Sequence, residues 1–299
     1  VTMSVGDDFV VAERSPLLRP RRAMSPASLA SCSATASSSW PVVIVVHEIP
    51  GITPAVERFA DDVVNAGFTV VMPNLVGTPG QEVSGKYIAS SMSKICVSRE
   101  FTTLAVQQTS PVISWLRALA RQLHEEVGGP GVGAIGMCFS GGFALGMMLD
   151  ERMIAPVLAQ PSLPFAIGKK KSSDLNLSAD DAVVIANRAA AGCQVLGLKF
   201  SDDKLVGDRF SALRTLLGDA FIGIEFPSAS KKDHSVLTEQ RVDEGVERVV
   251  AFLQEKLLTQ VQQYPCRAQF YSQPCHLARA EFGSQRPLAS VLYSQQVGF

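Results

Sequence analysis

Short, continuously apolar segments alternate with longer amphipathic segments through the middle of this 299-residue chain. Residues 42–46 are all valine or isoleucine, and residues 54–67 place apolar side chains at a helical spacing that ends at a glycine. Strands that alternate with helices of ten or more residues form βαβ units, and unbroken hydrophobicity in a strand indicates burial on both faces. The pattern therefore predicts an α/β fold with a doubly wound, mostly parallel sheet flanked by helices on both faces.

The same signals assign further elements along the chain. The expected strands span residues 42–47, 68–72, 131–137, 154–159, 195–200 and 221–226. The expected helices span residues 54–67, 104–123, 140–149, 179–191, 208–217 and 240–258. In open α/β sheets ligands bind outside the carboxyl ends of the strands, so functional residues are sought where each strand ends.

The two ends of the chain differ from its middle in composition. Residues 1–40 contain clustered arginines and many serines, with no acidic residue between Glu13 and Glu48, which predicts a disordered leader or, as the alternative, a targeting segment. Residues 9–12 within it are a candidate short strand. Residues 259–299 contain eight glutamines and three prolines without a helical stripe, and they are expected to be a poorly ordered tail. The predicted α/β domain therefore spans residues 41–258.

Charge and cysteine usage exclude several classes of function. The chain carries 27 Lys and Arg against 28 Asp and Glu, so no basic excess is available for nucleic acid. No apolar run reaches the roughly 18 to 20 residues of a membrane span. The six cysteines show no C-x-x-C spacing, which argues against a zinc site and against a small disulfide scaffold. We therefore expect a cytoplasmic protein with free thiols, without a metal, a membrane anchor or a nucleic-acid partner.

The third expected strand, residues 131–137, ends in a candidate nucleophile turn. Cys138 stands between the small residues Gly136 and Ser140, directly before a helix. This is the pattern of a nucleophile elbow, in which small flanking residues permit a tight turn and the helix N-terminus favours a thiolate. The alternative is a buried cysteine in a glycine-rich packing turn.

A nucleophile of this kind requires an acid and then a histidine later in the chain. His234 follows the last expected strand, in a loop where a catalytic histidine belongs, although it could also be a surface-loop residue. The acid is expected after residues 195–200, where Asp202 and Asp203 are both candidates, one to orient the imidazole and one to face solvent. The other histidines are His47, His124 and His276.

Glu48 follows the first expected strand, in a loop that donates an oxyanion N–H group in such sheets. A buried carboxylate needs hydrogen-bond donors, and we expect these to be the thiol of Cys138 or a nearby arginine. The alternative is an exposed glutamate paired with an arginine.

Four motifs in this order resemble the dienelactone hydrolase family of α/β-hydrolases: residues 47–51, 136–139, 203–206 and 234–235. The resemblance covers about residues 41–258 and implies the α/β-hydrolase fold. It implies roles for six residues: Cys138 as nucleophile, His234 as base, Asp203 as orienting acid, Glu48 as the glutamate that contacts the resting thiol, and Ile49 and Phe139 as backbone oxyanion donors. Asp203 fits better than Asp202 because it keeps the family's spacing to Val206.

The resemblance implies hydrolysis of small carboxylic esters or lactones through a thioester acyl-enzyme, without a cofactor. The chain departs from the family where dienelactone-cleaving members carry a carboxylate-binding arginine four residues after the histidine, because Thr238 stands there. Arg99 is a candidate substrate-binding residue in its place. Ser140 stands where many members have glycine, and one or two edge strands before Val42 are expected to be missing or irregular.

Two other functions remain open from the sequence. One is a non-catalytic α/β-hydrolase-like binding protein, and the other is a thiol redox sensor that uses Cys138. The intact set of Cys138, His234 and Asp203 favours the hydrolase, because a binding module needs no such set. The expected partner is a small-molecule ester or lactone, and the expected state is a monomer.

Overall fold

The computed structural model describes residues 9–12, 40–101, 105–165, 168–258 and 291–294. Within these ranges the strands form a single sheet in the order β1-β8-β3-β2-β4-β5-β6-β7. Neighbouring strands run parallel except β1 and β8, which pair antiparallel. The strands are β1 (Phe9–Ala12), β2 (Val42–Val46), β3 (Thr69–Met72), β4 (Val132–Met137), β5 (Met153–Ala159), β6 (Val195–Phe200), β7 (Phe221–Phe226) and β8 (Val291–Ser294).

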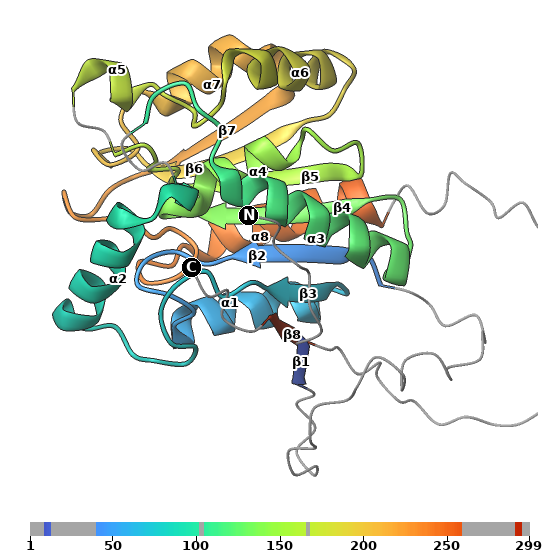
Figure 1. Ribbon diagram of the computed structural model, residues 1–299, viewed down its shortest axis with the longest axis horizontal. Coiled ribbons are helices and arrows are strands. Elements are labelled where there is room, and N and C mark those ends of the chain that lie inside the picture. The colour runs from blue at the N-terminus through green and yellow to red at the C-terminus, as the bar shows by residue number, and fades with distance from the viewer. Residues whose placement is uncertain (1–8, 13–39, 102–104, 166–167, 259–290, 295–299) are drawn as a thin grey trace, which may run out of the picture.

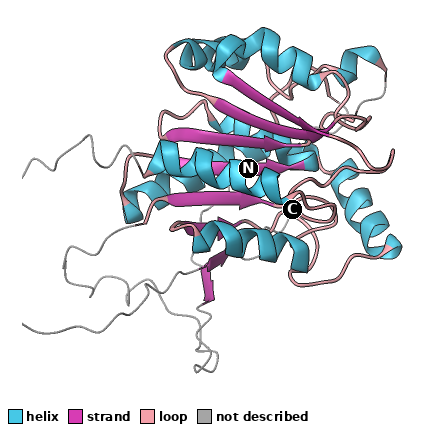
Figure 2. Cartoon of the chain, turned by 180° about the vertical axis from the view of Figure 1, so that it is seen from behind, coloured by secondary structure: helices cyan, strands magenta, loops and turns pink. Residues whose placement is uncertain are grey.

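Helices cover both faces of the sheet (Figures 1 and 2). They are α1 (Pro54–Asn65), α2 (Gly85–Val97), α3 (Pro111–Val127), α4 (Gly141–Met147), α5 (Lys169–Ser172), α6 (Ala179–Ala190), α7 (Arg209–Leu217) and α8 (Asp243–Leu257). Short 3-10 turns span Arg99–Phe101, Cys138–Ser140 and Gly218–Ala220. The predicted doubly wound, mostly parallel α/β sheet is confirmed.

The central strands contribute to two separate apolar cores because successive side chains point to opposite faces. In β2, Ile44 belongs to the core that includes the apolar faces of α3, α4, α6 and α7, whereas Val43 and Val45 belong to the core that includes those of α1 and α8. All five residues of β2 are buried. This explains why the strand is hydrophobic without a break, as a strand covered on both faces must be.

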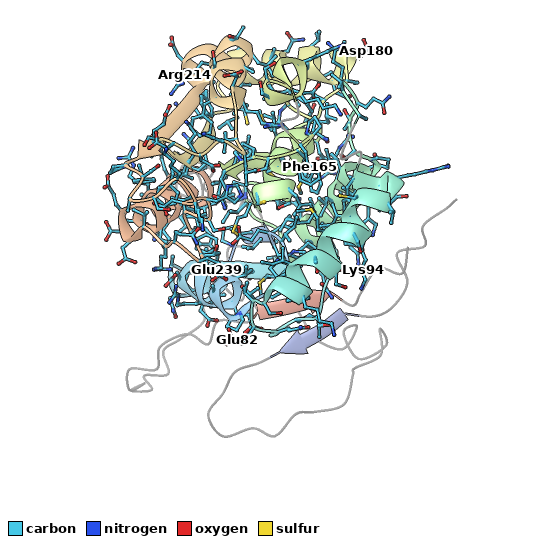
Figure 3. The ribbon with its side chains drawn as sticks, turned by 90° about the vertical axis from the view of Figure 1, so that its left-hand side faces the viewer. Glu82, Lys94, Phe165, Asp180, Arg214 and Glu239 are labelled. Carbon is cyan, nitrogen blue, oxygen red and sulfur yellow. The ribbon has the colours of Figure 1, made fainter. Side chains whose placement is uncertain are left out.

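The structure corrects two expectations about helices. The helix predicted from residue 104 begins at Pro111 instead, because proline suits the first turn, where its missing N–H would be unpaired anyway. Residue 104 itself lies outside the described residues. Helix α2 was not predicted, although its buried residues Tyr87, Ser91 and Ile95 are spaced four apart and Ser84 caps its N-terminus. Figure 3 faces the side of the molecule where α2, which carries Lys94, projects from the sheet.

Two described segments, one near each end of the chain, pair at one edge of the sheet. The candidate strand at residues 9–12 is present as β1, and it pairs with β8, which falls within the predicted tail. β8 in turn pairs parallel with β3. The other residues predicted as leader and tail lie outside the described ranges, apart from Trp40. None of the helices in the described part of the chain is long and apolar enough to cross a membrane.

Candidate active site

Cys138 occupies a strained turn at the end of β4. Its backbone has φ +54°, a left-handed conformation that costs energy in any residue but glycine. A Cβ atom at Gly136 would lie 2.2 Å from the carbonyl oxygen of Ser140, and one at Gly141 would lie 2.6 Å from Cα of Pro161. Glycine is therefore required on both sides of the turn. The residue is 9% exposed, so its thiol stands at the border between core and surface.

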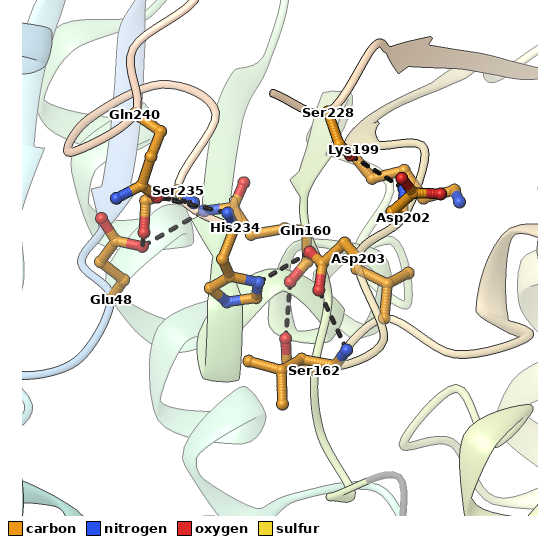
Figure 4. A network of polar contacts seen from close by, with 12 residues as sticks. Glu48, Gln160, Ser162, Lys199, Asp202, Asp203, Ser228, His234, Ser235 and Gln240 are labelled. Atoms are coloured by element: carbon orange, nitrogen blue, oxygen red, sulfur yellow. Dashed lines mark hydrogen bonds and ion pairs between the residues drawn. The ribbon is translucent and has the colours of Figure 1, made fainter. Parts of the chain in front are cut away.

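His234 and Asp203 are brought together from the loops that follow β7 and β6. His234 Nδ1 lies 2.7 Å from Asp203 Oδ2 (Figure 4). The Asp203 carboxylate also accepts the N–H of Leu205 at 3.0 Å. Asp203 is 7% exposed, so this bond is largely shielded from water. A buried carboxylate in this position holds an imidazole in one orientation and one tautomer.

The electrostatics of His234 connect it to Cys138. Burial alone would lower the pKa of His234, but the sulfur of Cys138 and the carboxylate of Asp203 outweigh it and raise the pKa to about 11. The Nε2 atom of His234 has no hydrogen-bond partner within normal geometry among the described residues. Such bonds are often long before a substrate binds. Because Cys138 is the largest of the influences that raise this pKa, the imidazole of His234 lies close to the sulfur of Cys138.

Asp202 lies next to Asp203 but faces solvent. Its backbone N–H donates to Ser228 Oγ at 2.9 Å, and the residue is exposed. Of the two candidate acids, Asp203 is the one whose carboxylate contacts the imidazole of His234.

Glu48 is buried at 2% exposure after β2, and its partners differ from those expected. Ser235 Oγ donates to its Oε2 at 2.7 Å, and Gln160 Nε2 donates to the same oxygen at 3.2 Å (Figure 4). The Thr238 hydroxyl donates to Oε1. Burial raises the pKa of Glu48, while the two hydroxyl donors and the nearby His234 oppose the rise. The prediction that the Cys138 thiol or an arginine would donate to Glu48 is wrong, because the carboxyl group points towards the segment that follows His234.

The two expected oxyanion donors lie in segments that are held together. Ile49 follows Glu48, and Phe139 is fully buried directly after Cys138. Ser140 Oγ lies within 3.0 Å of the carbonyl oxygens of Val46 and His47 and accepts the N–H of Met137 at 2.9 Å. The hydroxyl that distinguishes Ser140 from glycine therefore ties the turn at Cys138 to the end of β2.

Arg99 lies in the 3-10 turn Arg99–Phe101 that follows α2, and it is exposed. Its contact with a substrate stays a prediction. Thr238, at the position where the family's arginine was sought, directs its hydroxyl to Glu48. Within the described ranges, no group of three or more His, Cys, Asp or Glu side chains is arranged to hold a metal ion.

Several residues around Glu48 were missed from the sequence. Gln160 follows β5 and is fully buried, and Ser235 is buried beside His234. Gln160 directly follows β5, so the search for functional residues at strand ends could have found it. Ser235 and Thr238 carry no such signal, because a hydroxyl in a loop is common and its partner lies almost 190 residues away.

Comparison with known proteins adds a family match. The sequence pattern of the dienelactone hydrolase family matches residues 29–178, half of the chain, a range that contains Glu48 and Cys138 and ends before Asp203 and His234. No curated protein matches the sequence.

Solved structures with a related chain path are similar at low sequence identity. The dienelactone hydrolase from Anabaena variabilis is 14% identical, with a TM-score of 0.46 over 74% of this chain and 88% of that one. Est1E from Butyrivibrio proteoclasticus, solved with ferulic acid, is 13% identical, with a TM-score of 0.47 over 72% of this chain and 89% of that one.

Proposed function

The chain belongs to the dienelactone hydrolase family, with the α/β-hydrolase fold and carboxylic ester hydrolase activity, and on that premise we propose a thiol mechanism for it. Cys138 is the nucleophile, His234 the base and Asp203 the orienting acid. The substrate is a small ester or lactone. The observation that carries the proposal is the 2.7 Å bond between His234 Nδ1 and Asp203 Oδ2, next to a cysteine held in a strained turn.

The reaction proceeds in two halves. The Cys138 thiolate attacks the carbonyl carbon of the substrate. The resulting oxyanion accepts hydrogen bonds from the backbone N–H groups of Ile49 and Phe139, and each such donor lowers the activation free energy by about 2.7 to 4 kcal/mol. The C–O bond then breaks, and the leaving alkoxide takes the proton that His234 carries. In the second half, His234 takes a proton from water, hydroxide attacks the thioester, and the thiolate leaves with release of the acid.

Trapping the acyl-enzyme tests this mechanism. A chromogenic acetate ester mixed with the protein should give a burst of alcohol equal to one equivalent of enzyme. After an acid quench, the peptide that contains Cys138 should carry one acetyl group, which hydroxylamine removes. A binding protein or a redox sensor gives neither. Acetyl groups on a different peptide, or steady turnover without any trapped acyl group, would contradict the thioester mechanism.

Glu48 is proposed to keep the loop of His234 in place. Its carboxyl group accepts hydrogen bonds from the hydroxyl of Ser235, the neighbour of His234, and from that of Thr238. Glu48→Gln keeps the size and neutralises any charge, so the unfolding free energy should change by about 1 kcal/mol or less. We expect kcat for the ester to fall by more than this change in unfolding free energy explains, because the amide also removes the negative charge of Glu48 that favours a protonated His234.

Glu239 offers a matched control for Glu48. It lies on the same loop and acts electrostatically on Glu48, but it is exposed. Glu239→Gln should leave kcat for the chromogenic ester unchanged. Equal kcat values for Glu48→Gln and Glu239→Gln would show that Glu48 has no part in the reaction.

A cytoplasmic location and a monomeric state stay predictions.

A further inference from the structure

His47 is a fully buried histidine whose two ring nitrogens both have backbone partners. Its Nδ1 lies 2.8 Å from the carbonyl oxygen of Glu48. Its Nε2 lies 3.0 Å from the backbone nitrogen of Leu75 and 3.4 Å from that of Val76. The residue follows β2 directly, but the mechanism above gives it no role.

These contacts fix the tautomer of His47. A backbone N–H can only donate, so Nε2 accepts, and the proton of the neutral ring sits on Nδ1 and is donated to the Glu48 carbonyl. Burial lowers the pKa of His47 to about 4, against the opposing effect of the bond to Glu48, so the ring stays neutral near neutral pH.

The bond to the Glu48 carbonyl also sets the direction of the Ile49 N–H. The two groups belong to one planar peptide unit, which is trans because the cis peptide bonds in the described chain lie elsewhere. In a trans peptide the C=O and the N–H point in opposite directions. Holding the carbonyl towards His47 therefore holds the N–H on the far side of the unit. The Nδ1–H donor also polarises the peptide, which makes its N–H a better donor.

His47 contacts the second oxyanion residue as well. Its ring packs against the ring of Phe139, with centroids 5.8 Å apart and a tilt of 52°. The carbonyl of His47 itself lies 3.0 Å from Ser140 Oγ. One side chain thus touches both segments that are proposed to supply oxyanion donors.

From these contacts we propose that His47 is a positioning residue that orients the Glu48–Ile49 peptide, so that the Ile49 N–H is ready to receive the oxyanion. The inference rests on the proposed function, because it concerns the same reaction. The competing explanation is structural: His47 only anchors the loop of Leu75 and Val76 after β3.

Two substitutions separate these roles, because each keeps one half of the ring. Asn carries its polar atoms at the distance of Nδ1 and can still donate to the Glu48 carbonyl, whereas Gln carries them at the distance of Nε2 and can still accept from Leu75 and Val76. Both variants lose the packing on Phe139. His47→Asn should keep kcat within about tenfold of the wild type, and His47→Gln should lose about a hundredfold, the effect of one oxyanion donor.

Thermal unfolding should follow the opposite order. His47→Asn leaves two buried N–H groups without an acceptor, so its midpoint should be no higher than that of His47→Gln. KM for the ester should change little in either variant. A structural role predicts instead that activity follows stability, and a higher kcat in His47→Gln than in His47→Asn overturns the inference.

Alkylation of Cys138 by iodoacetamide completes the test. This reaction occurs at a saturated carbon and builds no oxyanion, so its rate in both variants should match the wild type. A rate that falls in step with kcat overturns the inference, because His47 would then act on the thiol. The proposed function fails separately, if the wild-type protein forms no acyl-enzyme at Cys138.

Discussion

Replacement of Cys138 with alanine is expected to lower kcat for a chromogenic ester by about 10⁴-fold or more, since loss of a nucleophile removes the covalent route. The variant should still fold, because alanine fills most of the space of a cysteine at this turn. Circular dichroism and the thermal midpoint check the fold, and initial rates at saturating ester check the activity. Residual hydrolysis would reflect only oxyanion binding and general-base attack of water.

Cys193 provides the matched control. It is half-buried after α6, its thiol lies 3.8 Å from the carbonyl oxygen of Met153, and burial raises its pKa. Cys193→Ala should hydrolyse the ester at the wild-type rate. Full turnover in Cys138→Ala, or its loss in Cys193→Ala, would assign the reaction to a different group.

A third variant measures the strain at Cys138. Glycine tolerates positive φ, whereas alanine does not. Cys138→Gly should therefore be more stable than Cys138→Ala by something on the order of 1 kcal/mol.

The sheet, and the strand ends at which the candidate residues lie, were predictable because both depend on local patterns. Runs such as residues 42–46 reveal strands buried on both faces. Once the sheet is parallel, the carboxyl ends of its strands share an edge, and Cys138, Asp203 and His234 must then approach one another. Their order along the chain then assigned a candidate role to each of them.

The partners of Glu48 were not predictable in this way. A buried carboxyl group requires donors, but the sequence does not say whether an arginine, a thiol or hydroxyl groups will supply them. Thr238 looked like the loss of a substrate-binding arginine, whereas the structure uses its hydroxyl inside the protein. Glu48 lies almost 190 residues from Ser235 and Thr238, so no sequence motif with a fixed spacing joins it to them.

Arg209 shows the same limit in the core. The sequence placed it in a predicted helix at residues 208–217, where an arginine is ordinarily exposed. It is 1% exposed, and its guanidinium group donates to backbone carbonyls of the segments around it. The acceptors are Leu163, Pro164, Lys171, Asp174, Leu205 and Val206. The arginine thereby ties the segment after Asp203 to the segments that contain Leu163 and Lys171, an arrangement that only the tertiary structure reveals.

Replacement of Asp203 with asparagine is expected to lower kcat by up to about 10⁴-fold, because an amide can donate to Nδ1 and so stabilise the wrong tautomer of the imidazole. The pH profile should change as well. Asp203 is one of the groups that raise the pKa of His234 to about 11. Its removal lowers that pKa, so His234 loses its proton, and the thiolate–imidazolium pair disappears, at a lower pH. The alkaline limb of kcat/KM should therefore move to lower pH.

Asp202→Asn is the control, since it makes the same chemical change one residue away. Asp202 is exposed and bonds through its backbone N–H to Ser228, so its carboxylate can be replaced without a change at His234. Its kcat and pH profile should match the wild type. A larger loss in Asp202→Asn than in Asp203→Asn would mean that the loop rearranges when a substrate binds. An unchanged alkaline limb in Asp203→Asn would mean that the charge of Cys138 alone keeps His234 protonated, with Asp203 acting only on the orientation of the ring.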